Sequence, residues 1–428
     1  MVKGGFMNKI IKKYLKYSEQ VFTFFSLIFY SDAILILVLS NGAGQSDVEL
    51  NYDTSLYRLC ASLIYTITFL LLIIRWKTSI YFIKMNLIVL LVFFLPLVSL
   101  LWSYSPLNTL KDSSALLGSS IFGIYFASRY TLKQQLRLLG WVFCISVILC
   151  PIFAIALPKY GMMGSAWRGI YLHKNGLGAS MALSTIIFLF LALSEKSNRW
   201  KHCLFCAFSL FLLLLSQSTS ALLNLSFSII LLAVFKILKL RYHIMIPTFF
   251  LLIFLSSNLY LWFTYSADTI FEIVGKDTTL TGRTDIWAAA FDMIVKKPWL
   301  GYGYGGFWYG LNSESAYIWR STNWVPTHPH NGFIAIWLDL GLLGLTIFFL
   351  GYLKTLFRAI VCVRYNIKKE GVWVLTFLIY MLLVNTTESA LIESNSLMWI
   401  LYISISFSLA IPLEHQTTVR AHKNEQAS

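Results

Sequence analysis

The sequence predicts an all-α membrane protein with about twelve transmembrane helices. Of its 428 residues, 57% are hydrophobic and only 12% are charged, and the mean hydropathy is +0.69. Soluble domains are about 45–50% apolar and about 25% charged, and disordered chains are more polar still. Both of those classes are therefore excluded. Two further observations support the prediction: long apolar runs recur along the chain, and its basic residues gather on one side of them.

Apolar runs of about 20 residues, the length that crosses the hydrocarbon core as a helix, mark the predicted elements. In chain order the twelve predicted helices cover residues 19–40, 56–74, 80–101, 110–127, 136–157, 176–194, 203–217, 219–235, 244–263, 331–353, 371–387 and 394–412. The first begins too far from the start, and lacks the small-residue cleavage site, to be a signal peptide.

The positive charge indicates the orientation in the membrane. If the N-terminus is cytoplasmic and the helices alternate, most of the 34 Lys and Arg residues fall in cytoplasmic segments, as the positive-inside rule requires. Both termini are then expected in the cytoplasm. The net charge of +15 becomes a topology signal, and nucleic acid is not an expected partner.

One segment, from about 264 to 330, forms a long outer (periplasmic) loop between helices nine and ten of the single polytopic membrane domain expected over 1–428. Long loops in compact proteins are usually functional. A short amphipathic helix is predicted within it, with Thr284 as its N-cap and Pro298 as its stop. The Gly-Tyr-Gly-Tyr-Gly-Gly run at 301–306 predicts a tight turn.

Basic residues are scarce on the outer side, so the few found there are candidates for binding an anion. Arg168 and Lys174 lie in one outer loop, and Arg283 and Arg320 in the other. A guanidinium matches phosphate oxygens bidentately, so several of these groups converging at the membrane surface would hold a pyrophosphate. Alternatively, each reaches lipid headgroups or pairs with a neighbouring acid such as Asp285.

Three histidines, His173, His328 and His330, face outward in this topology. A neutral imidazole is well suited to accept a proton from a sugar hydroxyl. His-x-His spacing also occurs in metal sites, but the motif offers no third His or nearby carboxylate, so neither a metal nor another cofactor is predicted. A third interpretation is that His330 or Asn331 merely caps helix ten.

Little ionisable chemistry lies within the predicted helices, where the acids are Asp32 and Asp339. Ion-coupled transporters generally need acidic or His groups inside the bundle. A non-catalytic polysaccharide exporter nevertheless remains an alternative from another functional class.

Short motifs cover most of the chain between the third and the tenth predicted helix. They are WSYSP at 102–106, WRGIYLHKNGLG at 167–178, SQSTS at 216–220, GRTDIW at 282–287, PWLGYG at 298–303, HNGF at 330–333 and LGLLG at 340–344. In this order and spacing they resemble the O-antigen ligase and polysaccharide polymerase superfamily of bacterial multi-pass membrane proteins. The resemblance implies a glycosyltransferase C-like membrane fold.

The same resemblance implies an inverting, metal-independent glycosyltransferase at the outer face of the bacterial inner membrane. It would polymerise undecaprenyl-pyrophosphate-linked oligosaccharide repeat units into O-antigen, capsule or exopolysaccharide. Arg168 and Arg283 would bind the pyrophosphate, and His330 would activate the acceptor hydroxyl. The further substrate-binding candidates are Lys174, Arg320, His173 and Asn331.

A polymerase is favoured over an O-antigen ligase that transfers the glycan to lipid A-core. The stretch at 216–220 lacks the arginine often present at this point in ligases, and HKNGLG at 173–178 resembles exopolysaccharide polymerases of the ExoQ or Wzy type. The implied partners are the lipid-linked glycan donor, an acceptor glycan on a lipid carrier or on lipid A-core, membrane lipid and a chain-length regulator.

Overall fold

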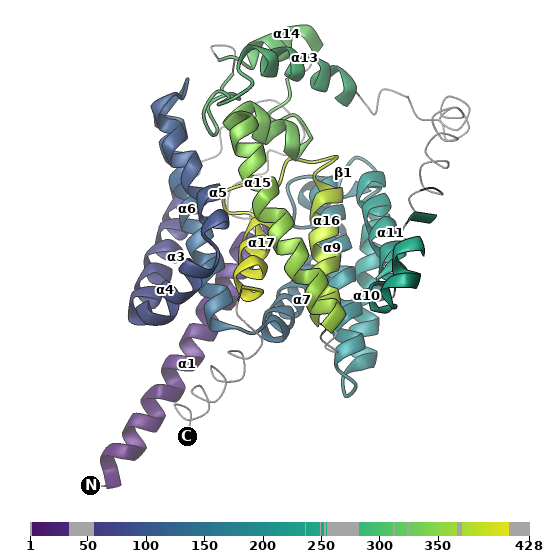
Figure 1. The fold of residues 1–428 in the computed structure, drawn as a ribbon. Coiled ribbons are helices and arrows are strands. Elements are labelled where there is room, and N and C mark those ends of the chain that lie inside the picture. Colours follow the sequence, from purple (N-terminus) through teal and green to yellow (C-terminus); the bar gives the residue numbers. More distant parts are fainter. Residues whose placement is uncertain are drawn as a thin grey trace. The chain divides into compact units, whose positions relative to one another are not determined.

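The computed structural model describes residues 2–33, 55–235, 237–248, 250–251, 254, 282–310, 313–322, 325–365 and 370–410. Within these ranges the regular secondary structure is helical, apart from one two-stranded antiparallel hairpin (Figure 1). The contacts divide the chain into two compact units. The first consists of Met1–Phe82, Gly118–Leu223 and Asn395–Ser408, and the second of Ile83–Leu117, Asn224–Ser394 and Leu409–Ser428. The single domain expected over 1–428 stays a prediction.

The first unit holds the hairpin and most of the N-terminal helices. Its elements are α1 (Val2–Tyr30), α3 (Ser55–Ile74), α7 (Leu132–Ala156), α8 (Pro158–Gly161), β1 (Met162–Met163), β2 (Ala166–Trp167), α9 (Lys174–Ser194), α10 (Arg199–Leu215) and α17 (Leu397–Ser408). Helices α9 and α10 pack side by side (Figure 1).

The second unit holds the predicted outer segment. Its elements are α5 (Leu87–Val98), the 3-10 turns η1 (Ser99–Leu101) and η2 (Ile237–Lys239), α13 (Arg283–Lys296), α14 (Ala316–Thr322), α15 (Gly332–Tyr365) and α16 (Glu370–Val384). Three helices, α4 (Trp76–Met85), α6 (Pro106–Arg129) and α11 (Thr219–Val234), have residues in both units.

Four helices among the described residues, α3, α7, α9 and α15, are long and apolar enough to cross a membrane. The bent pair Ser79–Met85 and Leu87–Leu101 would make a fifth span if counted as one. On α3, large apolar side chains at helical spacing are exposed, as expected where lipid replaces water; they are Leu56, Leu59, Leu63, Ile67, Leu70 and Ile74. The chain is a membrane protein by these features, but the predicted count of twelve helices and the placement of the long loop are not confirmed. Most of predicted helix 244–263 lies outside the described residues.

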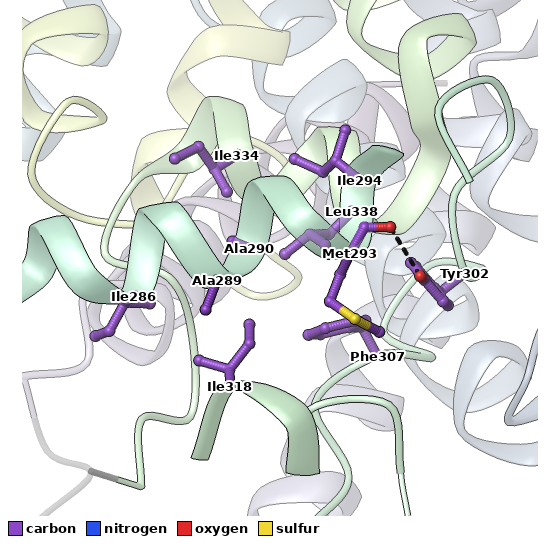
Figure 2. Close-up of a cluster of buried hydrophobic side chains, with 10 residues drawn as sticks. All are labelled: Ile286, Ala289, Ala290, Met293, Ile294, Tyr302, Phe307, Ile318, Ile334 and Leu338. Atoms are coloured by element: carbon purple, nitrogen blue, oxygen red, sulfur yellow. Dashed lines mark hydrogen bonds between the residues drawn. The ribbon is translucent and has the colours of Figure 1, made fainter. Parts of the chain in front are cut away.

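Helix α13 forms in the region where the sequence predicts a short amphipathic helix. Its buried face packs with α14, α15 and the following loop in one apolar cluster, in which Tyr302 Oη donates to the Met293 carbonyl at 2.8 Å (Figure 2). The predicted N-cap, Thr284, is wrong. The helix begins two residues earlier than that cap predicts, and its N-cap is Gly282, which adopts a φ of 81° without strain because glycine has no β-carbon.

The glycine-rich run forms the predicted tight turn, with φ values of 65°, 92° and 62° at Gly301, Gly303 and Gly305. It docks against a kink in α15 at Gly341, whose φ of 64° is not helical. Around this kink Tyr302 N–H donates to the Leu338 carbonyl at 2.8 Å. The kink therefore fixes the glycine-rich loop to α15.

Candidate active site

Three charged or titratable side chains surround the carboxylate of Glu388 in the second unit. Its Oε1 lies 3.3 Å from Nη2 of Arg283, and its Oε2 lies 3.4 Å from Nδ1 of His330. Nε2 of His328 is 3.9 Å from the same Oε2, and the two imidazole rings are 4.1 Å apart between centroids. Two predicted site residues, Arg283 and His330, are thus brought together by a carboxylate that the sequence analysis did not single out.

The backbone around His330 is held from two sides. Trp287 of α13 donates its indole N–H to the Pro329 carbonyl at 2.9 Å, and Asn331 N–H donates to Ser389 Oγ at 3.0 Å. His330 itself has a φ of 50°, a conformation that non-glycine residues rarely adopt and that functional sites often hold. The imidazole is therefore aimed by its surroundings.

Glu388 is positioned by the turn after α16. Arg283 donates from Nη1 to the Thr387 carbonyl, and Gly332 N–H donates to the Asn385 carbonyl at 2.9 Å. A β-carbon at Gly332 would lie 2.4 Å from Asn385 Oδ1, so only glycine permits this approach. The starts of α13 and α15 are in this way both fastened to the turn that carries Glu388.

The electrostatics favour an ionised Glu388 beside a neutral His330. Burial alone would raise the pKa of Glu388, but hydrogen bonds from His328 and His330 and the charge of Arg283 outweigh it, and the pKa lies well below its usual range. Burial lowers the pKa of His330, and Glu388 only partly offsets this effect. At neutral pH the imidazole can therefore accept a proton.

The same cluster has the composition of a metal-binding group. Ligand atoms of His328, His330 and Glu388 all lie within 4.8 Å of one another. Two imidazoles and a carboxylate form a common metal ligand set. The motif itself offers no carboxylate, and Glu388 reaches its two histidines from a turn distant in sequence. The prediction that the protein works without a metal is a separate one, which metal removal would test.

Comparisons with known proteins bear on this region. A family model described as O-antigen ligase matches residues 204–349. The Rickettsia felis protein named "Putative polysaccharide ligase" is 24% identical over 277 residues, which cover 59% of this chain and 63% of that protein. The exopolysaccharide production protein ExoQ of Rhizobium meliloti is 25% identical over 284 residues, which cover 60% of this chain and 63% of ExoQ. The comparisons confirm the resemblance to the O-antigen ligase and polysaccharide polymerase superfamily. The chain spans less than two thirds of the length of these relatives.

Within the region matched to O-antigen ligases lie Arg283 and His330, whereas Glu388 follows it. In sequence Glu388 is separated from His330 by the whole of α15 and α16. The sequence feature that indicates Glu388 is its place in the short turn predicted between helices eleven and twelve.

Two further candidate site residues, Asn331 and Arg320, also belong to the second unit but have other surroundings. Asn331 caps α15, because its Oδ1 accepts the N–H groups of Phe333 and Ile334 at 3.0 and 3.2 Å. The capping interpretation is thus confirmed for Asn331. Arg320, in the last turn of α14, lines a cavity of about 460 Å³ together with Tyr104, Tyr309 and Tyr317.

The remaining candidates, Arg168, His173 and Lys174, belong to the first unit. Arg168 is 5% exposed and donates to the backbone carbonyls of Tyr160, Leu172 and Lys159. These bonds give it a role in organising its own loop. His173 is the N-cap of α9, with Nδ1 accepting the Asn175 N–H at 3.1 Å, and Lys174 is the first residue of that helix.

Proposed function

We propose that this protein is a membrane glycosyltransferase that polymerises polyprenyl-pyrophosphate-linked oligosaccharide repeat units. The observation that carries the proposal is the His330–Glu388–Arg283 cluster, which combines a proton acceptor, its orienting carboxylate and a cation. The matches to O-antigen ligases and to ExoQ support a membrane polysaccharide-processing enzyme, and the motif at 173–178 favours the polymerase.

His330 is the general base of the proposed reaction. With Nδ1 turned to Glu388, Nε2 is the ring nitrogen that takes the proton from an acceptor hydroxyl. The deprotonated oxygen forms a bond to the anomeric carbon of the donor sugar from the face opposite the leaving group. The bond from that carbon to the pyrophosphate oxygen breaks at the same time, so the configuration inverts.

Arg283 is the proposed partner of the leaving group. The broken bond leaves its electron pair on the pyrophosphate lipid, and a preorganised guanidinium stabilises that charge as it develops. Among the described residues Arg283 spends two of the five N–H donors of a guanidinium on Thr387 and Glu388. Arg168 is the second pyrophosphate ligand of the proposal, on the strength of its sequence motif and of the scarcity of outward cations.

The proposed setting is the bacterial inner membrane, with both termini in the cytoplasm and the cluster at the outer face. The donor is undecaprenyl-pyrophosphate-linked glycan and the acceptor is a second lipid-linked glycan. A chain-length regulator and membrane lipid are the other proposed partners, and no metal or other cofactor takes part.

Purified full-length protein mixed with lipid-linked repeat units tests this function. Without nucleotide sugars and with a chelator present, glycans that grow by whole repeat units are expected, together with released pyrophosphate lipid. Mass spectrometry of the products would show them. Unchanged repeat units after long incubation would contradict the proposal.

Ligation to a lipid core is the second candidate, favoured by the ligase names of the family model and of the Rickettsia felis relative. The two reactions share a donor and differ in acceptor. Deletion of the gene decides between them. Loss of all polymer beyond one repeat unit indicates a polymerase, whereas full-length polymer retained on its lipid carrier indicates a ligase.

A further inference from the structure

A second cavity of the second unit adjoins the cluster and shares His328 with it. It has a volume of about 260 Å³, and its wall includes His328, Trp308, Asp112 and Asp339. It thus borders the motif that carries His330 and reaches along the first turns of α15.

Two carboxylates converge in this cavity. Asp112 of α6 accepts a hydrogen bond from Tyr309 Oη at 2.8 Å, and a β-carbon at Gly305 would lie 2.5 Å from its Oδ2. The backbone of Gly305 also hydrogen-bonds the carboxylate of Asp339. The glycine-rich loop therefore contacts both carboxylates through Gly305.

One of the carboxylate oxygens has an unfilled hydrogen-bonding capacity among the described residues. Asp339 Oδ1 is buried and has no hydrogen-bond partner among the described residues. Buried polar atoms are nearly always hydrogen-bonded, so an orphan carboxylate oxygen beside a cavity is suited to accept from a hydroxyl or an amine placed there.

The charge of the cavity decides which part of the substrates fits. The described residues in its wall include the acids Asp112, Asp339 and Glu393 but no Lys or Arg. An anionic pyrophosphate or a uronic acid would be repelled there. Trp308 adds a ring on which a sugar face can stack, and this ring is held because it packs against the apolar cluster around α13.

We infer that this cavity is the subsite for the acceptor sugar and that it selects an uncharged or amino sugar over an acidic one. Hydroxyl or amine groups of the sugar donate to Asp339 and Asp112, and the ring packs on Trp308. The assignment to the acceptor rests on the proposed function, since the sugar would present its nucleophilic hydroxyl toward His330. The sugar selectivity rests on the cavity alone.

Binding of simple glycosides tests the subsite without any turnover. The probes are the methyl glycosides of glucose, galactose, N-acetylglucosamine, glucosamine and glucuronic acid, titrated into detergent-purified full-length protein and followed by saturation-transfer NMR. At least one neutral or amino glycoside is expected to bind at least about tenfold more tightly than the glucuronide, and Asp339→Asn and Asp112→Asn should each weaken it about tenfold. The matched control is Asp292→Asn, an exposed acid of α13, which should bind like the wild type.

Three results would overturn the inference: equal binding of the glucuronide, wild-type affinity in both Asn variants, or no binding of any neutral or amino glycoside. If the Asn variants do not fold, the ranking of the probes on the wild type still decides. The outcomes also separate this inference from the proposed function. If glycosides bind but no transfer occurs, the subsite is supported and the proposed glycosyltransferase function is contradicted. If transfer occurs but the acceptor KM is unchanged in Asp339→Asn, the function is supported and the subsite is contradicted.

Discussion

Glu388 acts on two site residues at once. It accepts a hydrogen bond from His330 Nδ1, which sets the tautomer of the ring, and it forms an ion pair with Arg283 at the start of α13. Because both neighbours share one carboxylate, the position of the base and that of the cation are coupled. Glu388 is thus a positioning residue.

The first prediction concerns the pH dependence of transfer. Burial holds the pKa of His330 below its ordinary value of about 6.5, so the acid limb of kcat/KM should lie below that pH. Glu388 raises the pKa of His330, and Glu388→Gln should therefore move the limb to lower pH, while the plateau falls at least about tenfold as the ring loses its orientation. Initial rates measured between about pH 4.5 and 8 would show both changes. A limb that stays in place in the variant would mean that His330 is not the base.

The second prediction separates the two arginines. Arg168→Ala leaves three part-buried backbone carbonyls without their donor, which should cost about 2 kcal/mol of folding free energy. Arg283→Ala should cost about two to three powers of ten in transfer rate. Thermal unfolding of the detergent-solubilised variants, followed by intrinsic fluorescence, should show the larger loss for Arg168→Ala. An unchanged unfolding midpoint in that variant would contradict the structural role of Arg168.

Arg283 and His330 could be proposed from the sequence because basic side chains are scarce on the predicted outer side. Glu388 could not, since its link to His330 exists only once α15 and α16 have folded. Asn331 is the reverse case. Its place directly before α15 makes it a cap, and capping rules alone explain it.

At the scale of elements, the glycine-rich loop and the kinked helix α15 shape the site together. The loop needs a left-handed backbone at Gly301, Gly303 and Gly305, and it needs room for close neighbours. The sequence predicts the turn but not its docking, because the kink at Gly341 interrupts an apolar run that reads as one straight helix. The cavity between loop and helix was for the same reason not predictable.

The third prediction tests this docking. A β-carbon at Gly303 would lie 2.5 Å from the Ser103 side chain, and the φ of 92° strains any other residue. Gly303→Ala should therefore lose about 2–3 kcal/mol of stability and weaken glycoside binding. Gly164→Ala is the matched control, because its φ of 61° is also positive but nothing lies within 4 Å of the added carbon. Equal losses of stability in both variants would show that the backbone strain matters and the docking does not.

At the scale of the whole molecule, the sequence predicts the class of protein better than it predicts the arrangement of the helices. Apolar content identifies a membrane protein, and the motifs carry the resemblance to the O-antigen ligase and polysaccharide polymerase superfamily. The predicted count of twelve spans is not confirmed: four helices of the described residues, or five with the bent pair, meet the length requirement, whereas the apolar helices α16 and α17 are shorter.

The fourth prediction concerns metal removal. If the His328–His330–Glu388 group works as base and orienter, extensive dialysis against a chelator should leave the transfer rate within about twofold of the untreated enzyme, as expected when no Lewis acid takes part. Elemental analysis of the dialysed protein checks that the metal is gone. A rate that falls sharply and returns on adding Zn²⁺ or another divalent cation would assign the cluster to a metal instead.

The central claim is that His330 performs glycosyl transfer, and one comparison tests it most directly. The release of pyrophosphate lipid from lipid-linked repeat units is measured for the wild type, His330→Gln and His202→Gln. His202 is the matched control, since its Nε2 also lies 3.4 Å from a glutamate, Glu195, but in the first unit. The expected result is a rate lower by about two to three powers of ten in His330→Gln alone. Release at the wild-type rate in His330→Gln would contradict the claim.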